Sequence, residues 1–120
     1  MLAMDWVTKD LNHLRKRARR LRAYSKSCAT FLPSRGSLVA QVLCIEVLHA
    51  HVMEEEVSVK MLFAATGFSV SGCRAQFAWL VENGFLITAQ AENDRRRQVV
   101  IPTPKLKDKF QLLMQAMERI

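Results

Sequence analysis

The fold of this chain is decided between Val57 and Thr103, where the sequence is VSVKMLFAATGFSVSGCRAQFAWLVENGFLITAQAENDRRRQVVIPT. Two short helical patterns, over 59–66 and 70–83, are separated by the turn Gly67–Phe68–Ser69. A serine precedes each helix, where its hydroxyl can cap the first turn, and a glycine follows each, where a left-handed residue can end a helix. The stretch therefore predicts two helices packed at a steep angle across a short glycine-containing turn.

Two strand-like segments follow the second helix, over 85–90 and 98–103. Both contain β-branched residues, and the polar segment 91–97 between them includes the turn former Asn93–Asp94. They predict a β-hairpin with Arg95, Arg96 and Arg97 at its tip. A helix-turn-helix followed by a hairpin with a cationic tip is a winged helix, so the predicted fold is mainly α with a small β-hairpin (α+β).

The regions on either side of this motif are predicted to be helical. Over 5–25 and again after Pro104, apolar residues recur at alternating spacings of four and three. So narrow an apolar seam needs a surface to pack on, either its own domain or a second subunit. Ser37 can cap a further helix through about Met53, whose residues Leu38, Val42, Ile45, Val47, Leu48 and Val52 we expect to be mostly buried.

The net charge of +7 lies entirely in the first third of the chain. Residues 1–36 contain nine lysines and arginines against two aspartates, whereas the remainder has nine basic and nine acidic residues. This asymmetry favours a polyanionic partner, with nucleic acid first and an acidic membrane surface second, over a merely solvated helix face. Candidate phosphate contacts are Arg15, Lys16, Arg19 and Arg20.

The predicted elements suit double-stranded DNA. Helix 70–83 can enter the major groove while the hairpin tip 91–97 reaches the adjacent minor groove. Arg74 and Gln76 are the side chains on this helix best able to read base edges, because arginine suits guanine and glutamine suits adenine. Asp94 can hold one of the tip guanidinium groups in a bidentate pair and so aim it.

The same residues resemble the MarR family of winged-helix transcription regulators. The match is carried by 57–71, by Leu80–Ile87 and by the run Asn93–Arg97 with Val99–Thr103 after it. The resemblance implies a repressor that is a homodimer with intertwined terminal helices, and a small-molecule effector. It places Ser71, Gly72, Arg74 and Ala75 in the groove, and Asp94 with Arg95 or Arg96 at the wing contact. The candidate DNA-binding set is completed by Ser69, Gln76, Asn93 and Arg97. The residues expected to form the dimer interface are Leu11, Leu14, Leu21, Leu106, Phe110, Leu113 and Met117.

The resemblance divides one domain into three parts. A basic arm over 1–36 precedes the winged helix-turn-helix region 37–103, and a dimerisation helix over 104–120 follows it.

Enzymatic chemistry is not indicated. We find no paired carboxylates, no nucleophile–base constellation and no glycine-rich phosphate loop, and we expect no cofactor and no metal. The cysteines Cys28, Cys44 and Cys73 are odd in number and lack metal-ligand spacing, and Cys73 is expected to be a small core residue. No apolar run approaches the ~20 residues that span a bilayer. We therefore expect a cytoplasmic, nucleoid-associated protein without a membrane partner.

Two alternatives stay open. Trp79 is predicted on the outward side of its helix, where an indole normally has a partner, so the winged helix could serve as a protein-interaction module. A plasmid or phage replication or partition protein would bind DNA through the same elements.

Overall fold

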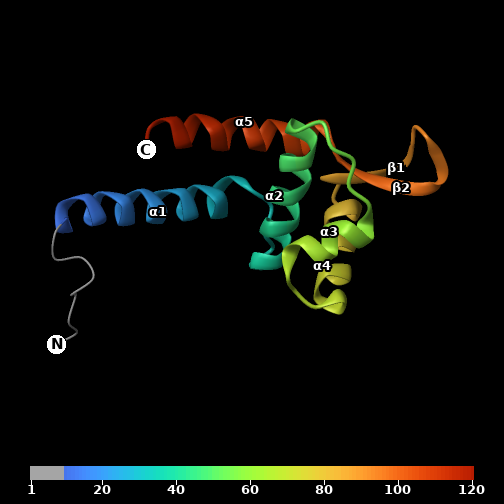
Figure 1. Ribbon diagram of the computed structural model, residues 1–120, viewed down its shortest axis with the longest axis horizontal. Coiled ribbons are helices and arrows are strands. Elements are labelled where there is room, and N and C mark those ends of the chain that lie inside the picture. The colour runs from blue at the N-terminus through green and yellow to red at the C-terminus, as the bar shows by residue number, and fades with distance from the viewer. Residues whose placement is uncertain (1–9) are drawn as a thin grey trace.

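The computed structural model describes residues 10–120, which form five helices and a two-stranded antiparallel hairpin. In Figure 1 the first and last helices extend side by side toward one end of the molecule, and the hairpin projects at the other. This mainly helical α+β architecture confirms the predicted fold class. The elements are α1 (Leu11–Phe31), α2 (Leu38–Val52), α3 (Val59–Thr66), α4 (Val70–Glu82), β1 (Leu86–Ala91), β2 (Asp94–Pro102) and α5 (Pro104–Glu118).

The helix-turn-helix forms as the sequence predicts. The Ser58 hydroxyl accepts a hydrogen bond from the Met61 amide at 3.1 Å and so caps α3. Gly67 ends that helix with φ of +74°, a conformation that only glycine adopts without strain. Ser69 caps α4 in the same way, and α4 ends at Glu82, one residue before the predicted end.

The hairpin differs from the prediction at its tip. β2 begins at Asp94 rather than Gln98, so the arginines belong to the strand and not to the loop. Gln90 pairs with Gln98 but Ala91 pairs with Asp94, which leaves three residues of β2 unmatched. Arg95, Arg96 and Arg97 therefore form a bulge. On the other edge of β2, Ser58 forms a single bridge with Val99, which ties the segment before α3 to the hairpin.

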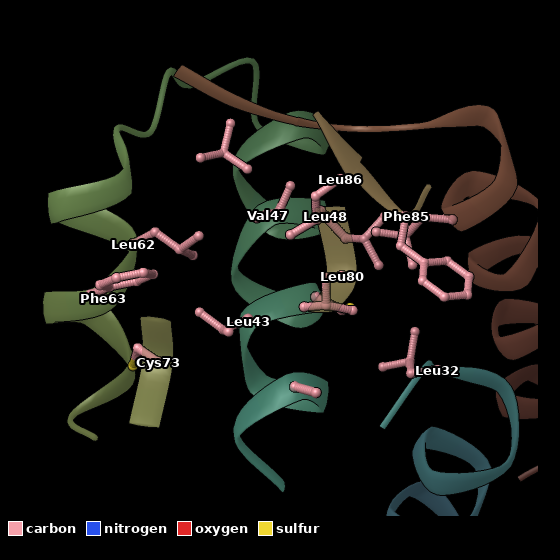
Figure 2. Close-up of a cluster of buried hydrophobic side chains, with 14 of the residues drawn as sticks. Leu32, Leu43, Val47, Leu48, Leu62, Phe63, Cys73, Leu80, Phe85 and Leu86 are labelled. Atoms are coloured by element: carbon pink, nitrogen blue, oxygen red, sulfur yellow. The ribbon is translucent and has the colours of Figure 1, made fainter. Parts of the chain in front are cut away.

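The core gathers around α2, with leucines from α3, α4, β1 and α5 and with Val100 from β2 (Figure 2). The largest fully buried side chains are Leu43, Leu62, Leu80, Leu86 and Leu106. Each stabilises the fold by about 1.5–3 kcal/mol through removal of apolar surface from water. These five come from α2, α3, α4, β1 and α5 in turn, so one core fixes the helix-turn-helix against the hairpin and against α5.

The buried face of α2 was predicted only in part. Val47 and Leu48 are buried as expected, but Leu38, Ile45 and Val52 are 63%, 41% and 60% exposed. Since α2 is apolar on all sides, the sequence pattern does not mark which side packs inward. Phe68 and Val70, at the turn between α3 and α4, are also exposed.

The helix α1 is longer than predicted at its C-terminal end, reaching Phe31 instead of residue 25. It begins at Leu11, where Asp10 caps it by accepting a hydrogen bond from the His13 amide at 3.2 Å. Residues 5–9, where the prediction began this helix, lie outside the described residues. Ser37 precedes α2 as predicted but its side chain makes no cap hydrogen bond. None of the helices between residues 10 and 120 is long and apolar enough to cross a membrane.

Candidate nucleic-acid interface

The N-terminal half of α4 presents an exposed polar surface. Ser71, Arg74 and Ala75 are all exposed there. The first amide groups of a helix lack intrahelical partners and carry the positive end of its dipole, so they bind anions such as phosphate. This end of α4 can therefore hold a phosphate oxygen while Arg74 extends toward a base edge.

Gly72 lies beneath the capping hydroxyl of the same helix. The Ser69 hydroxyl accepts from the Gly72 amide at 3.2 Å, and a Cβ added to Gly72 would lie 3.1 Å from that oxygen. This is tighter than an ordinary van der Waals contact, so a side chain here would push against the cap. The resemblance places Gly72 in the groove and gives no sign of this contact with the cap.

Gln76 was predicted to present its side-chain amide to a base, but the structure does not place the whole amide in solvent. It is half-buried, and its carbonyl oxygen Oε1 is buried with no hydrogen-bond partner in the described part of the chain. A base-reading glutamine must offer both its carbonyl and its amide nitrogen to adenine. In this conformation Gln76 cannot do so.

The hairpin bulge presents two arginines to solvent without an acidic partner among the described residues. Arg95 and Arg96 are exposed, and the one ion pair between residues 10 and 120 joins Arg97 to Glu56. Asp94 was predicted to hold the guanidinium of a tip arginine. Instead its carboxylate oxygen Oδ1 accepts a hydrogen bond from the backbone amide of Arg96 at 2.9 Å. It shapes the backbone of the bulge instead. Asn93 lies in the adjoining turn and is exposed.

Glu56 was not assigned any role from sequence. Its Oε2 accepts from Arg97 Nη2 at 2.6 Å, although the two residues are far apart in the chain. The contact arises because the segment before α3 pairs with β2. In this pairing the amide of Val100 donates to the carbonyl of Val57, the residue after Glu56, at 2.8 Å. A run of three glutamates gave no sign of this contact, because it depends on a tertiary pairing.

Trp79 is half-buried rather than free on an outward face. Its ring lies against Phe85, with centroids 6.0 Å apart, and the Arg35 guanidinium carbon lies 5.9 Å from its ring centroid. A cation above an aromatic face is attracted to it. The indole therefore finds its partners within the fold, from the turn before α2 and the end of α4.

The basic residues of α1 lie apart from α4 and the hairpin. Arg15, Lys16, Arg19 and Arg20 are exposed on a helix that packs along α5 (Figure 1). The cations of α1 are thus a group separate from those of the hairpin and α4.

The predicted dimerisation residues differ in their burial within the protomer. Leu106 and Leu113 are buried inside the protomer, so they belong to its own core and were wrongly assigned to a subunit interface. Leu11 and Leu21, by contrast, are 38% and 71% exposed. Leu14, Phe110 and Met117 are half-buried.

A cavity of about 290 Å³ lies between α1, α2 and α5. Its walls are apolar, with Leu48, Phe110 and Met117 among them, and Cys28 and His49 are its polar groups. Burial raises the pKa of the Cys28 thiol and raises that of the neighbouring core residue Cys44 to about 12. Both thiols are therefore protonated at neutral pH and poorly nucleophilic. Residues 10–120 contain no group of three or more metal-ligating side chains.

Several solved structures have the same fold. RV1404 from Mycobacterium tuberculosis aligns with a TM-score of 0.70 and 12% identity over 99% of this chain and 77% of its own. MarR from E. coli, in its apo form, aligns with a TM-score of 0.58 and 14% identity over 98% and 78%. The transcriptional repressor CouR, solved on a 23-mer DNA duplex, aligns with a TM-score of 0.58 and 16% identity over 98% and 80%.

These alignments define the fold class. The chain has a MarR-like winged-helix fold, as the resemblance implied. It is shorter than the chains it aligns with, and it spans only 54% of a matched transcriptional regulator from Thermotoga maritima. No model of a protein family and no curated protein matches the sequence.

Proposed function

We propose that this chain is a DNA-binding transcription regulator of the MarR type, acting as a dimeric repressor. The observation that carries the proposal is the pair Arg95 and Arg96, exposed on a hairpin bulge in the same domain as a capped helix whose start is also exposed. A repressor of the same fold has been solved on a DNA duplex, which supports the same use here.

In the proposed complex α4 enters the major groove. Ser71 and the first amides of α4 bind a phosphate, and Arg74 reads a guanine edge through its two parallel donors. Ala75 is small enough to let the helix approach the bases closely. Gln76 is assigned no contact with a base, because its carbonyl oxygen is buried.

The hairpin then reaches the minor groove beside that site. Arg95 and Arg96 sit in the bulge and gain from the negative potential of a narrow minor groove. Arg97 is engaged by Glu56, so it contributes less positive charge to this contact.

The dimer is proposed to form through the exposed seam of α1. This helix has no fully buried residue, although it is 21 residues long, and Leu21 is 71% exposed. In proteins most of a helix's stability comes from packing of its apolar face, and the seam of α1 has no cover within the described protomer. A second copy of the chain would bury Leu11 and Leu21 and so stabilise α1.

An effector is proposed to bind in the cavity between α1, α2 and α5. Its apolar walls suit a small hydrophobic molecule, and His49 could bond one polar group of it. A ligand there would touch both the dimer arm and α2, on which the helix-turn-helix packs.

DNA binding is tested by selecting preferred duplexes from a randomised library and measuring affinity by fluorescence anisotropy. Arg95→Ala/Arg96→Ala should weaken binding on every sequence and lower the salt slope by about two per copy. Arg74→Ala should cost about 1–3 kcal/mol of discrimination at one base position. The matched control Lys107→Ala/Arg119→Ala removes two exposed charges of α5 and should change neither quantity. Unchanged binding by both hairpin and α4 variants would refute the docking geometry.

Dimerisation is tested by sedimentation of Leu21→Glu. The side chain is mostly exposed in the protomer, so the substitution should leave the fold intact while a charge in the seam separates the subunits. A wild-type chain that sediments as a monomer at all concentrations would contradict the proposed dimer.

A further inference from the structure

The helix α1 carries a concentration of positive charge that the fold does not use. It contains seven lysines and arginines and no acidic residue, and all seven are exposed. None of them forms an ion pair with any of residues 10–120, where Arg97–Glu56 is the one such pair. The seven are Arg15, Arg17, Arg19, Arg20, Arg22, Lys16 and Lys26.

These charges destabilise the helix that carries them. Arg15 and Arg19, Lys16 and Arg20, and Arg22 and Lys26 are like-charge pairs four residues apart, each costing about 0.2–0.5 kcal/mol. None lies in the last turn, where the helix dipole would favour a cation. Since α1 has no fully buried residue, packing offsets little of this cost. We therefore interpret these charges as a binding surface for an anionic partner.

Six of the seven charges, all but Arg17, lie on one side of the helix. Spacings of four, three and four place Arg15, Arg19, Arg22 and Lys26 along one line, and Lys16 and Arg20 along the next. The line of Arg15, Arg19, Arg22 and Lys26 lies about a quarter of a turn around the helix from the apolar seam that contains Leu14 and Leu21. This basic surface, defined by these six residues, stays open when the seam is covered.

The basic surface is remote from α4 and the hairpin. The molecule is 56 Å along its longest axis, and in Figure 1 the start of α1 lies at the end opposite the hairpin. The main packing partner of the helix is α5. A duplex held by α4 and the hairpin at one end of the molecule therefore leaves the basic surface of α1 free for another.

We infer that the basic surface of α1 binds a second DNA duplex, so that a dimer holds two duplexes at once and bridges them. The inference rests on the proposed function, which supplies the first duplex. An α-helix is 10–12 Å across with its side chains and fits the B-DNA major groove of about 12 Å, whereas the major groove of an RNA duplex is too narrow for it. Five of the seven cations are arginines, whose planar forks bind phosphate in a bidentate way.

A membrane is the less suitable partner for this surface. Helices that lie in the lipid interface need a broad face of bulky apolar residues. The seam of α1 is narrow, contains Ala18 and Ser25, and is the surface proposed for the dimer. A DNA duplex, by contrast, can bind through its phosphate groups to the exposed cations alone, without an apolar face.

The experiment is a capture assay with two short duplexes of mixed sequence. One duplex is fixed to beads and saturated with the full-length protein, and capture of a second, fluorescent duplex is measured over a series of salt concentrations. The test variant is Arg15→Gln/Arg19→Gln/Arg22→Gln. The matched control is Lys107→Gln/Lys109→Gln/Arg119→Gln, which removes the same charge from α5. Glutamine keeps a similar helix propensity, and circular dichroism and sedimentation verify the fold and the subunit number.

Wild type and the α5 control should capture the second duplex, and the α1 variant should lose at least about tenfold in capture, with a salt slope lower by about three per copy. Binding of a single duplex should change by less than about threefold. Equal capture by the α1 variant would overturn the proposal, as would a parallel loss of single-duplex binding, since α1 would then contact the first duplex. Preference of α1 for duplex RNA, or for vesicles containing phosphatidylserine without duplex capture, would also overturn it. A wild-type protein that binds no DNA at the first step would instead refute the proposed function.

Discussion

Arg97 on β2 donates from Nη2 to Oε2 of Glu56 at 2.6 Å, which joins the hairpin to the segment that leads into α3. Both side chains are partly exposed, at 48% and 41%. In this arrangement one of the three bulge arginines is neutralised, and the two others face solvent without an acidic partner from residues 10–120. The pair therefore limits the positive charge that the hairpin offers to DNA.

Replacing Glu56 with glutamine should strengthen DNA binding. The substitution releases the Arg97 charge and removes an anion beside the duplex, so we expect affinity to rise about two- to tenfold at low salt. The unfolding free energy should change by less than about 1 kcal/mol, because exposed ion pairs contribute little. Anisotropy titrations and urea denaturation measure the two quantities. Glu55→Gln is the matched control, since it removes the same charge without an ion pair; an equal gain in both variants would contradict a specific role for the pair.

Gln76→Met should stabilise the protein by about 1 kcal/mol without changing base preference. Methionine has a similar shape and removes a buried carbonyl oxygen that has no partner among the described residues, and such groups cost about 1–3 kcal/mol. Chemical denaturation measures the gain, and binding to the selected duplexes measures base preference. Arg74→Met serves as the comparison, because it should alter that preference. If Gln76→Met lost discrimination for adenine at one position, the buried orientation would not be the one used on DNA.

Sequence signals that act within a few residues predicted the helix-turn-helix. Features that depend on contacts between distant residues were not predicted. The bounds of α3 followed from a capping serine and a left-handed Gly67, both of which act within one turn of the helix. The inward face of α2 did not follow, because Leu38 and Leu43 are equally apolar and only the neighbouring elements decide which is buried. The start of β2 was missed because a run of arginines has no strand pattern, and cross-strand pairing produces the bulge. The Glu56 ion pair depends on the same pairing.

Thr103→Ala should destabilise the protein by about 1–3 kcal/mol. The hydroxyl is buried, donates to the Gly84 carbonyl at 2.6 Å and accepts from the Leu106 amide at 3.3 Å as the cap of α5. Alanine removes both bonds and leaves buried groups unpaired. Because the bond to Gly84 links the turn after α4 to the residue that follows β2, DNA affinity should fall as well. Thr103→Ser keeps the hydroxyl and should restore most of the stability; equal losses in both variants would show that the methyl group, rather than the hydrogen bonds, matters.

Cys44 should make the protein less stable in alkali. Burial raises the pKa of its thiol from the ordinary 9.0 to about 12, because the thiolate would lose its hydration in the core. Below pH 9.0 both the folded and the unfolded chain keep the proton, so this thiol leaves stability unchanged with pH. Between the two values the unfolded chain releases the proton and the folded chain keeps it. The unfolding free energy must therefore fall as pH rises through this range.

The variant Cys44→Ala isolates this contribution. Every other titratable group is present in both proteins, so its effect cancels in the difference between wild type and variant. Urea denaturation between about pH 7 and pH 11 should show wild type losing stability faster than Cys44→Ala once the pH passes the ordinary thiol pKa. Alanine leaves a small cavity and lowers stability at every pH, which shifts the difference without changing its slope. A difference that stays constant up to pH 11 would mean that the Cys44 thiol ionises as readily in the fold as in the unfolded chain.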